Sequence, residues 1–356
     1  MSRYWSKLTK KLTPYVPGEQ ASQAQLVKLN TNENPYSPSP KVLEAVAGVS
    51  GNQMRLYPEP ESSVLRQAFA DINQLSPDQV FLGNGSDEVL AHIFQGLLSH
   101  DKVVCFPDVS YSFYPVWCEL YSLAYDLIPL ADDFTVDINA YPAGNGGIII
   151  PNPNAPTGIL LGLNGIRDLL ERNSESVVVI DEAYIDFGGE SAVALIDDYD
   201  NLLVVQTVSK SRALAGLRVG VAMGHRDLIE GLERVKNSFN SYPLGVLAQT
   251  ATLASLRDAP YFERSCAKVI ATREALTVQL QGMGFKVLPS KANFIFVSHP
   301  QYDAKYLLDG LRENNILVRH FDQPRIEAYL RISVGTDEQC KTLVDVLASL
   351  QVAIKT

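Results

Sequence analysis

The sequence predicts an α/β fold, with a large domain built on a mostly parallel seven-stranded sheet between helices and a smaller α/β domain after it. Two observations predict this fold. Seven short apolar runs rich in β-branched residues lie between positions 80 and 223, and helical segments separate several of them. Runs that are apolar at nearly every position are typical of parallel strands covered on both faces. After position 284 the runs change in character, which indicates a second, antiparallel sheet.

The elements follow in a regular order. The strands of the large sheet are predicted at residues 80–82, 103–106, 125–130, 148–151, 177–181, 202–208 and 219–223. Helices are predicted at residues 87–98, 165–172 and 262–283. In the smaller domain we expect strands at 285–289, 292–297, 316–321 and 329–335, and helices at 303–314 and 336–351.

This order divides the chain into three parts. Residues 1–42 are expected to form a proline-rich N-terminal arm that joins the small domain. Residues 43–260 form the large domain and residues 261–356 the small C-terminal domain. A chain of 356 residues is long enough for two such domains.

Composition and charge favour an ordinary globular enzyme. The net charge of −10 argues against a nucleic-acid or anionic-membrane partner. The 4 cysteines are far apart and the 5 histidines are scattered, which fits reduced thiols in the cytoplasm and gives no metal site. No apolar run reaches the roughly 18 residues of a membrane span, and no apolar segment of a signal peptide follows the basic N-terminus.

Polar residues gather where the predicted strands end, and ligands of open α/β sheets bind beyond those carboxyl ends. The stretch GNGSDE at 83–88 places glycines before a helix N-terminus, whose N–H groups can bind an anion. A simple capped turn explains this stretch equally well when it is taken alone. The stretch NPNAPTG at 152–158 forms a rigid turn, which either presents an asparagine or has a structural role only.

Asp181 and Lys210 end two further strands. A buried carboxylate at position 181 needs a partner, which is either a cationic ring nitrogen or an arginine. Tyr184 follows three positions later and can reach the same pocket. No glycine lies within residues 201–209, which excludes a Walker-type phosphate loop before Lys210. A desolvated lysine at this position suits a covalent bond to a carbonyl group, whereas a solvated loop lysine is the alternative.

These sites together describe one ligand. Arg218 begins the next strand, where its guanidinium can meet a phosphate. The ligand therefore has a phosphate, a cationic ring nitrogen that faces a carboxylate, and a carbonyl within reach of a lysine. Pyridoxal phosphate has all three features.

The motifs GNGSDE, PNPNAPTG, VVVIDEAY and VSKSRALAGLRVG, in this order and spacing, resemble those of the fold-type I pyridoxal-phosphate aminotransferases. The resemblance covers nearly the whole chain, and it implies an aspartate-aminotransferase-like fold and a homodimer. The stretches KLNTNENPYSPSP, RLYPEP and YLRISVGT are similar to those of family members that act on histidinol phosphate.

The resemblance also implies a role for each motif residue. Lys210 holds the cofactor covalently and moves the substrate proton, Asp181 pairs with the ring nitrogen, and Tyr184 binds the ring hydroxyl. The other implied cofactor contacts are Gly85, Ser86, Asp87, Ser209 and Arg218 at the phosphate, Tyr111 stacked on the ring, and Tyr57 at the phosphate in the neighbouring subunit.

One position departs from the family pattern. Relatives commonly have an asparagine directly before the second proline of the turn at 152–158, and this asparagine touches the ring hydroxyl. Here that position is Ala155. We expect Asn154 to supply the amide instead.

For the substrate, the resemblance points to Arg331 as the anion-binding arginine, with Arg319 beside it. One arginine pair can serve the carboxylate of 2-oxoglutarate and the phosphate of histidinol phosphate in turn. Tyr15, Asn34 and Tyr242 are expected to close the pocket, although surface or packing roles remain open for Arg319 and Tyr242.

The implied reaction is a ping-pong transamination of L-histidinol phosphate with 2-oxoglutarate, which gives imidazole-acetol phosphate and L-glutamate and belongs to histidine biosynthesis. An aminotransferase for aromatic amino acids and a threonine-phosphate decarboxylase are the alternatives within the same fold. A non-catalytic regulator module is disfavoured, because too few residues precede the sheet for a DNA-binding domain.

Overall fold

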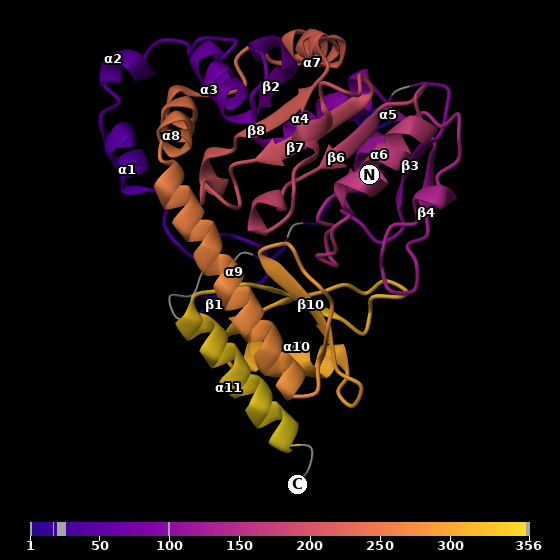
Figure 1. Cartoon of the computed structure of the whole chain (residues 1–356), viewed down its shortest axis with the longest axis vertical. Coiled ribbons are helices and arrows are strands. Elements are labelled where there is room, and N and C mark those ends of the chain that lie inside the picture. Colours follow the sequence, from indigo (N-terminus) through magenta and orange to yellow (C-terminus); the bar gives the residue numbers. More distant parts are fainter. Residues whose placement is uncertain (1, 17, 20–25, 99, 354–356) are drawn as a thin grey trace.

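A seven-stranded sheet forms the centre of the structure, a computed structural model that describes residues 2–16, 18–19, 26–98 and 100–353 (Figure 1). Its strands have the order β2-β8-β7-β6-β5-β3-β4. Their bounds are β2 (Val80–Gly83), β3 (Val104–Pro107), β4 (Tyr125–Ile128), β5 (Gly147–Pro151), β6 (Val178–Asp181), β7 (Leu202–Thr207) and β8 (Gly220–Gly224). The predicted seven strands are therefore confirmed. Strands β3 to β7 are parallel to their neighbours within this group, whereas β8 runs antiparallel to β2 and β7.

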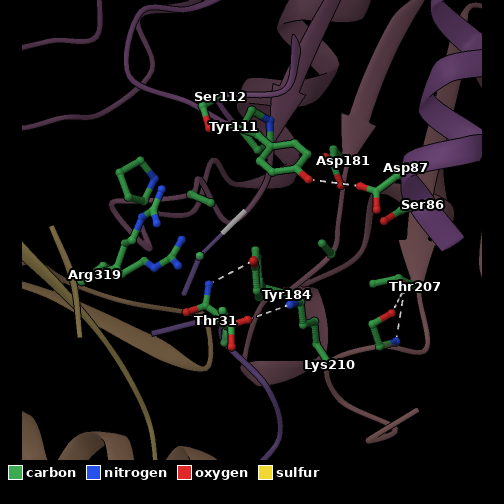
Figure 2. Close-up of a pocket in the computed structure, with 18 of the residues that line it drawn as sticks. Thr31, Ser86, Asp87, Tyr111, Ser112, Asp181, Tyr184, Thr207, Lys210 and Arg319 are labelled. Atoms are coloured by element: carbon green, nitrogen blue, oxygen red, sulfur yellow. Dashed lines mark hydrogen bonds between the residues drawn. The ribbon is translucent and has the colours of Figure 1, made fainter. Parts of the chain in front are cut away.

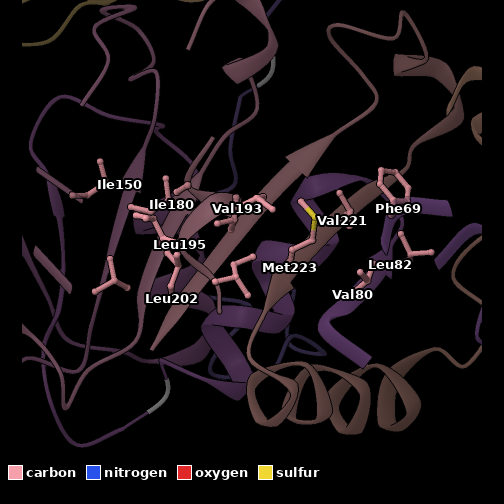
Figure 3. Packing of buried hydrophobic residues seen from close by; sticks show 14 of the residues in the cluster. Phe69, Val80, Leu82, Ile150, Ile180, Val193, Leu195, Leu202, Val221 and Met223 are labelled. Carbon is pink, nitrogen blue, oxygen red and sulfur yellow. The ribbon is translucent and has the colours of Figure 1, made fainter. Parts of the chain in front are cut away.

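Helices cover both faces of this sheet because alternate strand residues point to opposite sides. Ile148 and Ile150 pack toward α3 (Ser63–Asn73), α6 (Leu163–Arg172) and α8 (Val246–Leu256), in the cluster shown in Figure 3. Ile149, between them, packs on the other side with α4 (Gly85–Gly96), α5 (Tyr114–Tyr121) and α7 (Arg226–Phe239). Nearly continuous apolar strands were expected for a sheet buried in this way.

The register of the parallel strands brings their polar ends to one edge. Pro151 at the end of β5 lies opposite Asp181 at the end of β6, and Asp181 lies opposite Val205 in β7. The turns that follow these three strands therefore leave the sheet at the same edge. The fold thus concentrates there the polar residues of three motifs that are distant in the sequence.

A second, four-stranded sheet has the order β12-β13-β10-β9, and all its strand pairs are antiparallel. Its strands are β9 (Lys286–Val287), β10 (Phe294–Ser298), β12 (Arg319–His320) and β13 (Leu330–Ser333). The long helix α9 (Ala259–Gly282) runs from the region of the large sheet to α10 (Ala304–Glu313) and α11 (Asp337–Ala353) (Figure 1).

The prediction of a single strand at 316–321 is wrong, because this segment changes partners at Val318. Strand β11 (Ile316–Leu317) pairs in parallel with β1 (Val27–Lys28), which comes from the N-terminal arm. Strand β12 then pairs with β13 in the four-stranded sheet. The arm is thereby attached beside the four-stranded sheet, which brings its next residues to the edge of the large sheet.

The remaining elements are short. Helices α1 (Pro40–Ala47) and α2 (Gly51–Met54) follow the arm, and Ser39 caps α1 by accepting a hydrogen bond from the Lys41 amide. Single 3₁₀ turns occur at Pro77–Gln79, Ile138–Ala140, Ile185–Phe187, Ala192–Leu195 and Ala215–Leu217. None of the helices in the described ranges is long and apolar enough to cross a membrane.

Candidate active site

A cavity of about 340 Å³ opens at the polar edge of the large sheet. The four-stranded sheet and the N-terminal arm close its other side (Figure 2). Most of the residues predicted for the site line this one cavity: Tyr15, Ser86, Asp87, Tyr111, Asp181, Tyr184, Ser209, Lys210, Arg218, Arg319 and Arg331. A volume of this size suits a small ligand.

Two predicted residues lie just behind the cavity wall. The Asn34 side chain donates hydrogen bonds to the backbone oxygens of Lys210 (3.0 Å) and Ser211 (3.2 Å), so it supports the lysine loop from outside. Gly85 lies beneath the lining residues at the start of α4.

Asn154 is also buried outside the lining. Its Nδ2 donates to the backbone oxygen of Val109 and to Thr157 Oγ1, each at 3.0 Å. Both amide hydrogens are thus committed, while Oδ1 has no partner among the described residues. Ala155 lines the cavity in its place and brings no polar group there.

Tyr57 and Tyr242 lie on the surface, away from the cavity lining. Their rings stack with centroids 4.9 Å apart, and Tyr57 is 83% exposed. The cavity of the single chain therefore includes neither of them.

One end of the cavity is an anion cup at the N-terminus of α4. Gly85 has a φ of +80°, and a Cβ there would lie 2.5 Å from Arg218 Nη2. A Cβ on Gly220 would lie 2.4 Å from the Gly85 backbone, so both positions require glycine for the close approach. Arg218 Nη2 binds Asp87 Oδ2 at 2.7 Å, and the Tyr111 hydroxyl donates to Asp87 Oδ1 at 3.1 Å. Backbone N–H groups and a guanidinium thus meet where a phosphate can bind.

Asp181 forms the floor of the cavity at the end of β6. Its Oδ2 accepts a hydrogen bond from the Tyr114 hydroxyl at 2.8 Å, whereas Oδ1 has no partner among the described residues. Burial raises the pKa of Asp181 to about 6, against the opposing effect of the Tyr114 hydrogen bond. A buried carboxylate with one open oxygen is suited to a cationic N–H donor from a ligand.

Lys210 lies between these groups and the arm. Its Nζ donates to the backbone oxygen of Thr31 at 3.2 Å and lies 5.8 Å from the centre of the Tyr184 ring. No carboxylate of the described residues forms a salt bridge with it. The amine therefore has a polar but uncharged immediate partner, which a ligand carbonyl can replace.

The opposite end of the cavity is cationic. Arg331 Nη2 donates to the backbone oxygen of Asn30 at 2.8 Å, and Nε has no partner among the described residues. Phe321 lies 5.4 Å from the Arg331 guanidinium and 5.6 Å from that of Arg319. Burial lowers the pKa of Arg331, yet a guanidinium stays charged at neutral pH. Figure 2 shows Arg319 on the far side of Lys210 and Tyr184 from Ser86 and Asp87.

The sequence does not predict several residues in and behind the cavity wall, among them Tyr114, which is fully buried and does not line the cavity. Tyr114, which binds Asp181, lies in a stretch with other tyrosines, and no spacing singles it out. Asn30, Thr31 and Asn32 line the cavity from the arm. The motif KLNTNENPY marks this segment of the arm as part of the site. Only the pairing of β1 with β11 shows which asparagines of the motif face the cavity.

The fold and this cavity define a class of proteins. The chain has the fold of a histidinol-phosphate aminotransferase from Sinorhizobium meliloti solved in complex with pyridoxal-5'-phosphate, with a TM-score of 0.88, 23% identity and coverage of 99% of both chains. It also has the fold of a Thermus thermophilus aspartate aminotransferase mutant, with a TM-score of 0.81, 19% identity and coverage of 98% of this chain and 100% of that one. The predicted aspartate-aminotransferase-like fold is confirmed.

The chain belongs to the aminotransferase class I and II family, whose model it matches over residues 24–347. It is 59% identical to a histidinol-phosphate aminotransferase from a Pseudomonas putida strain, across 98% of this chain and 100% of the relative. It is 58% identical to histidinol-phosphate aminotransferase 2 from Dechloromonas aromatica, across 98% and 99% of the two chains. The family membership predicted from the motifs is therefore confirmed.

Proposed function

We propose that the protein uses pyridoxal phosphate to transfer the amino group of L-histidinol phosphate to 2-oxoglutarate, giving imidazole-acetol phosphate and L-glutamate in histidine biosynthesis. The observation that carries this proposal is a single cavity with two separate cationic ends and Lys210 between them. One end fits a cofactor phosphate, and the other fits an anionic substrate. The names of the curated relatives support the same substrate.

The residues present fit the proposed cofactor. The open Oδ1 of Asp181 matches a protonated ring nitrogen, and the glycine-lined cup at Gly85 and Gly220 matches a phosphate. Ser86, Asp87, Ser209 and Arg218 would hold that phosphate, and Tyr111 and Tyr184 would contact the ring. When bound, pyridoxal phosphate supplies an electron sink for the pair left by the broken Cα–H bond.

The chain's own groups then perform the remaining tasks. Lys210 Nζ, once the substrate amine has replaced it, would take the proton from the substrate Cα and deliver it to the cofactor carbon that receives the amino group. In the second half-reaction it would move a proton in the opposite direction, from that carbon to the Cα of the product. Arg331 exchanges its bond to the Asn30 carbonyl for the phosphate of one substrate and then for a carboxylate of the other. Two substrates that use one anion site in turn require a ping-pong order.

A substrate panel tests the proposal. We expect kcat/KM with histidinol phosphate to exceed that with phenylalanine or tyrosine by at least about 100-fold, since the carboxylate of an amino acid offers the paired guanidinium groups less charge and fewer acceptor oxygens than a phosphate does. The amino acceptor is 2-oxoglutarate in every assay. A preference for the aromatic amino acids, or release of carbon dioxide from threonine phosphate, would contradict the proposed substrate.

We further propose a homodimer in which Tyr57 of each subunit reaches the neighbouring active site. Tyr57 stacks on Tyr242, and further large apolar side chains that are close to one of these two tyrosines in the sequence are exposed, as is typical of an interface: Met54, Leu56, Phe239 and Leu247. Mixing Tyr57→Ala subunits with Lys210→Ala subunits should restore up to about a quarter of wild-type activity, because half of the dimers then contain one intact site. A monomer in sedimentation, or a mixture no more active than its parts, would contradict this arrangement.

The protein is also proposed to act in the cytoplasm. All 4 cysteines are buried and free, as expected in a reducing compartment. Recovery of the protein outside the cytoplasmic fraction would contradict this location.

A further inference from the structure

Three consecutive residues of the arm contact three functional groups of the cavity. Asn30 accepts from Arg331 through its backbone oxygen, and Thr31 accepts from Lys210 in the same way. Asn32 differs, because it contacts the cavity through its side chain: its Nδ2 donates to the Tyr184 hydroxyl oxygen at 3.1 Å. This contact joins the arm to a residue of the large-sheet edge.

The Asn32 amide is held in one orientation. Asn32 is 1% exposed and has a φ of +55°, which asparagine tolerates better than most residues. Its backbone N–H donates to Ser333 Oγ at 2.8 Å, and its Oδ1 accepts from the same hydroxyl at 2.9 Å. Asn293 Nδ2 donates to the Asn32 backbone oxygen at 2.9 Å. With Oδ1 facing Ser333, the Nδ2 group must face Tyr184.

This orientation determines the direction of the hydrogen bond. An amide NH₂ group can only donate, so the Tyr184 oxygen accepts and keeps its own hydrogen for another acceptor. Tyr184 Oη has no further hydrogen-bond partner within the described part of the chain. Its O–H is therefore available to a ligand in the cavity.

No side chain of the turn at 152–158 donates a hydrogen bond to the Tyr184 hydroxyl in place of Asn32. Ala155, which lines the cavity, has no polar group, and both amide hydrogens of Asn154 are bound elsewhere. Asn32 is the amide that reaches Tyr184.

We propose that Asn32 is a positioning residue that sets the Tyr184 hydroxyl as a hydrogen-bond donor toward the ring hydroxyl of the cofactor. The inference rests on the proposed function, because it assumes pyridoxal phosphate in this cavity. A donor at that position stabilises the anionic form of the ring oxygen and lowers its proton affinity. A purely structural role of Asn32, as a tie between the arm and β13, would leave that proton affinity unchanged.

The test uses the pH titration of the absorbance of the bound cofactor in the full-length protein. Asn32→Asp keeps the shape, the tolerance of positive φ and the acceptor for Ser333, but it replaces the donor with an acceptor. The Tyr184 O–H then turns to the introduced carboxylate. We expect the titration midpoint to rise, with a proton affinity about tenfold higher than in the wild type.

A double-mutant cycle separates this effect from the added charge. In a Tyr184→Phe background the carboxylate acts through its charge alone, so we expect a clearly smaller shift there. Equal shifts in the two backgrounds would overturn the inference. Asn32→Gly provides a neutral second variant that also tolerates positive φ. It should raise the proton affinity about threefold with Tyr184 present and leave it unchanged in the Tyr184→Phe background.

The outcomes also separate this inference from the proposed function. If the wild-type protein takes up pyridoxal phosphate and transaminates histidinol phosphate while both Asn32 variants shift equally in the two backgrounds, only the role of Asn32 is overturned. If the wild-type protein takes up no pyridoxal phosphate, both proposals are overturned.

Discussion

Lys210→Ala is expected to lower kcat for transamination by at least about 10⁴-fold, the largest effect of any single substitution in this chain. Lys210 is the amine that projects into the cavity between the anion cup and Arg331. The variant removes the covalent attachment point and the base that moves the substrate proton, whereas the phosphate cup at Arg218 and the carboxylate of Asp181 remain. Pyridoxal phosphate should therefore still bind, although without a covalent bond.

Borohydride reduction followed by peptide mapping provides the measurement. In the wild type the pyridoxyl group should be found on the peptide that contains Lys210, and in the variant no lysine should be labelled. Lys268→Ala is the matched control, because Lys268 is exposed and its Nζ contacts the Tyr36 ring (4.1 Å) rather than the cavity. Labelling of a different lysine, or a Lys210→Ala protein with near wild-type kcat, would refute the role proposed for Lys210.

Much of the site could be predicted because the sequence marks where each strand ends. Asp181 and Lys210 each follow an apolar run, and parallel strands bring their carboxyl ends together without further information. The anion cup could likewise be predicted, since GNGSDE combines glycines with a helix start. Local patterns are sufficient where the chemistry is carried by residues adjacent to a strand.

Contacts between distant segments could not be predicted in this way. The change of partner at Val318 depends on β1, which is only two residues long and has no strand pattern of its own. The Asn32 contact with Tyr184 follows from that pairing, and so does the position of Thr31 beside Lys210. The family resemblance instead points to Asn154 as the amide of the site. A family pattern aligns positions in the sequence, but it does not show which group the amide of a side chain binds.

Asp181→Asn is expected to lower kcat by about 10³-fold, since a neutral amide cannot keep the ring nitrogen of the cofactor protonated. The substitution preserves the shape of the side chain, and its oxygen can still accept the hydrogen bond from Tyr114. Steady-state assays with saturating pyridoxal phosphate measure the effect. A loss that added cofactor fully restores would show that Asp181 contributes only to cofactor affinity.

The same substitution should have the opposite effect on the stability of the cofactor-free protein. Burial raises the pKa of Asp181 from 3.8 to about 6, so the folded state binds this proton more tightly than the unfolded state does. The associated stability is fully present below pH 3.8 and is lost as the pH rises to about 6. At pH 8 the buried charge therefore costs the wild type about 2–3 kcal/mol, which the neutral amide avoids.

Urea unfolding of both proteins without cofactor tests the direction of this difference in the free energy of unfolding. Asp181→Asn should be the more stable protein at pH 8, and its advantage should fall to about half at pH 5. Glu182, whose pKa burial raises to about 7, titrates in the same range but is present in both proteins, so its contribution cancels from the difference.

Addition of pyridoxal phosphate should reverse the order of stability of the two proteins, because only the wild-type carboxylate then gains a cationic partner. A variant that is less stable than the wild type at pH 8 without cofactor would show that the open oxygen of Asp181 carries no such cost. In that case the cofactor-free protein would not lose stability by keeping the Asp181 carboxylate charged and unpaired.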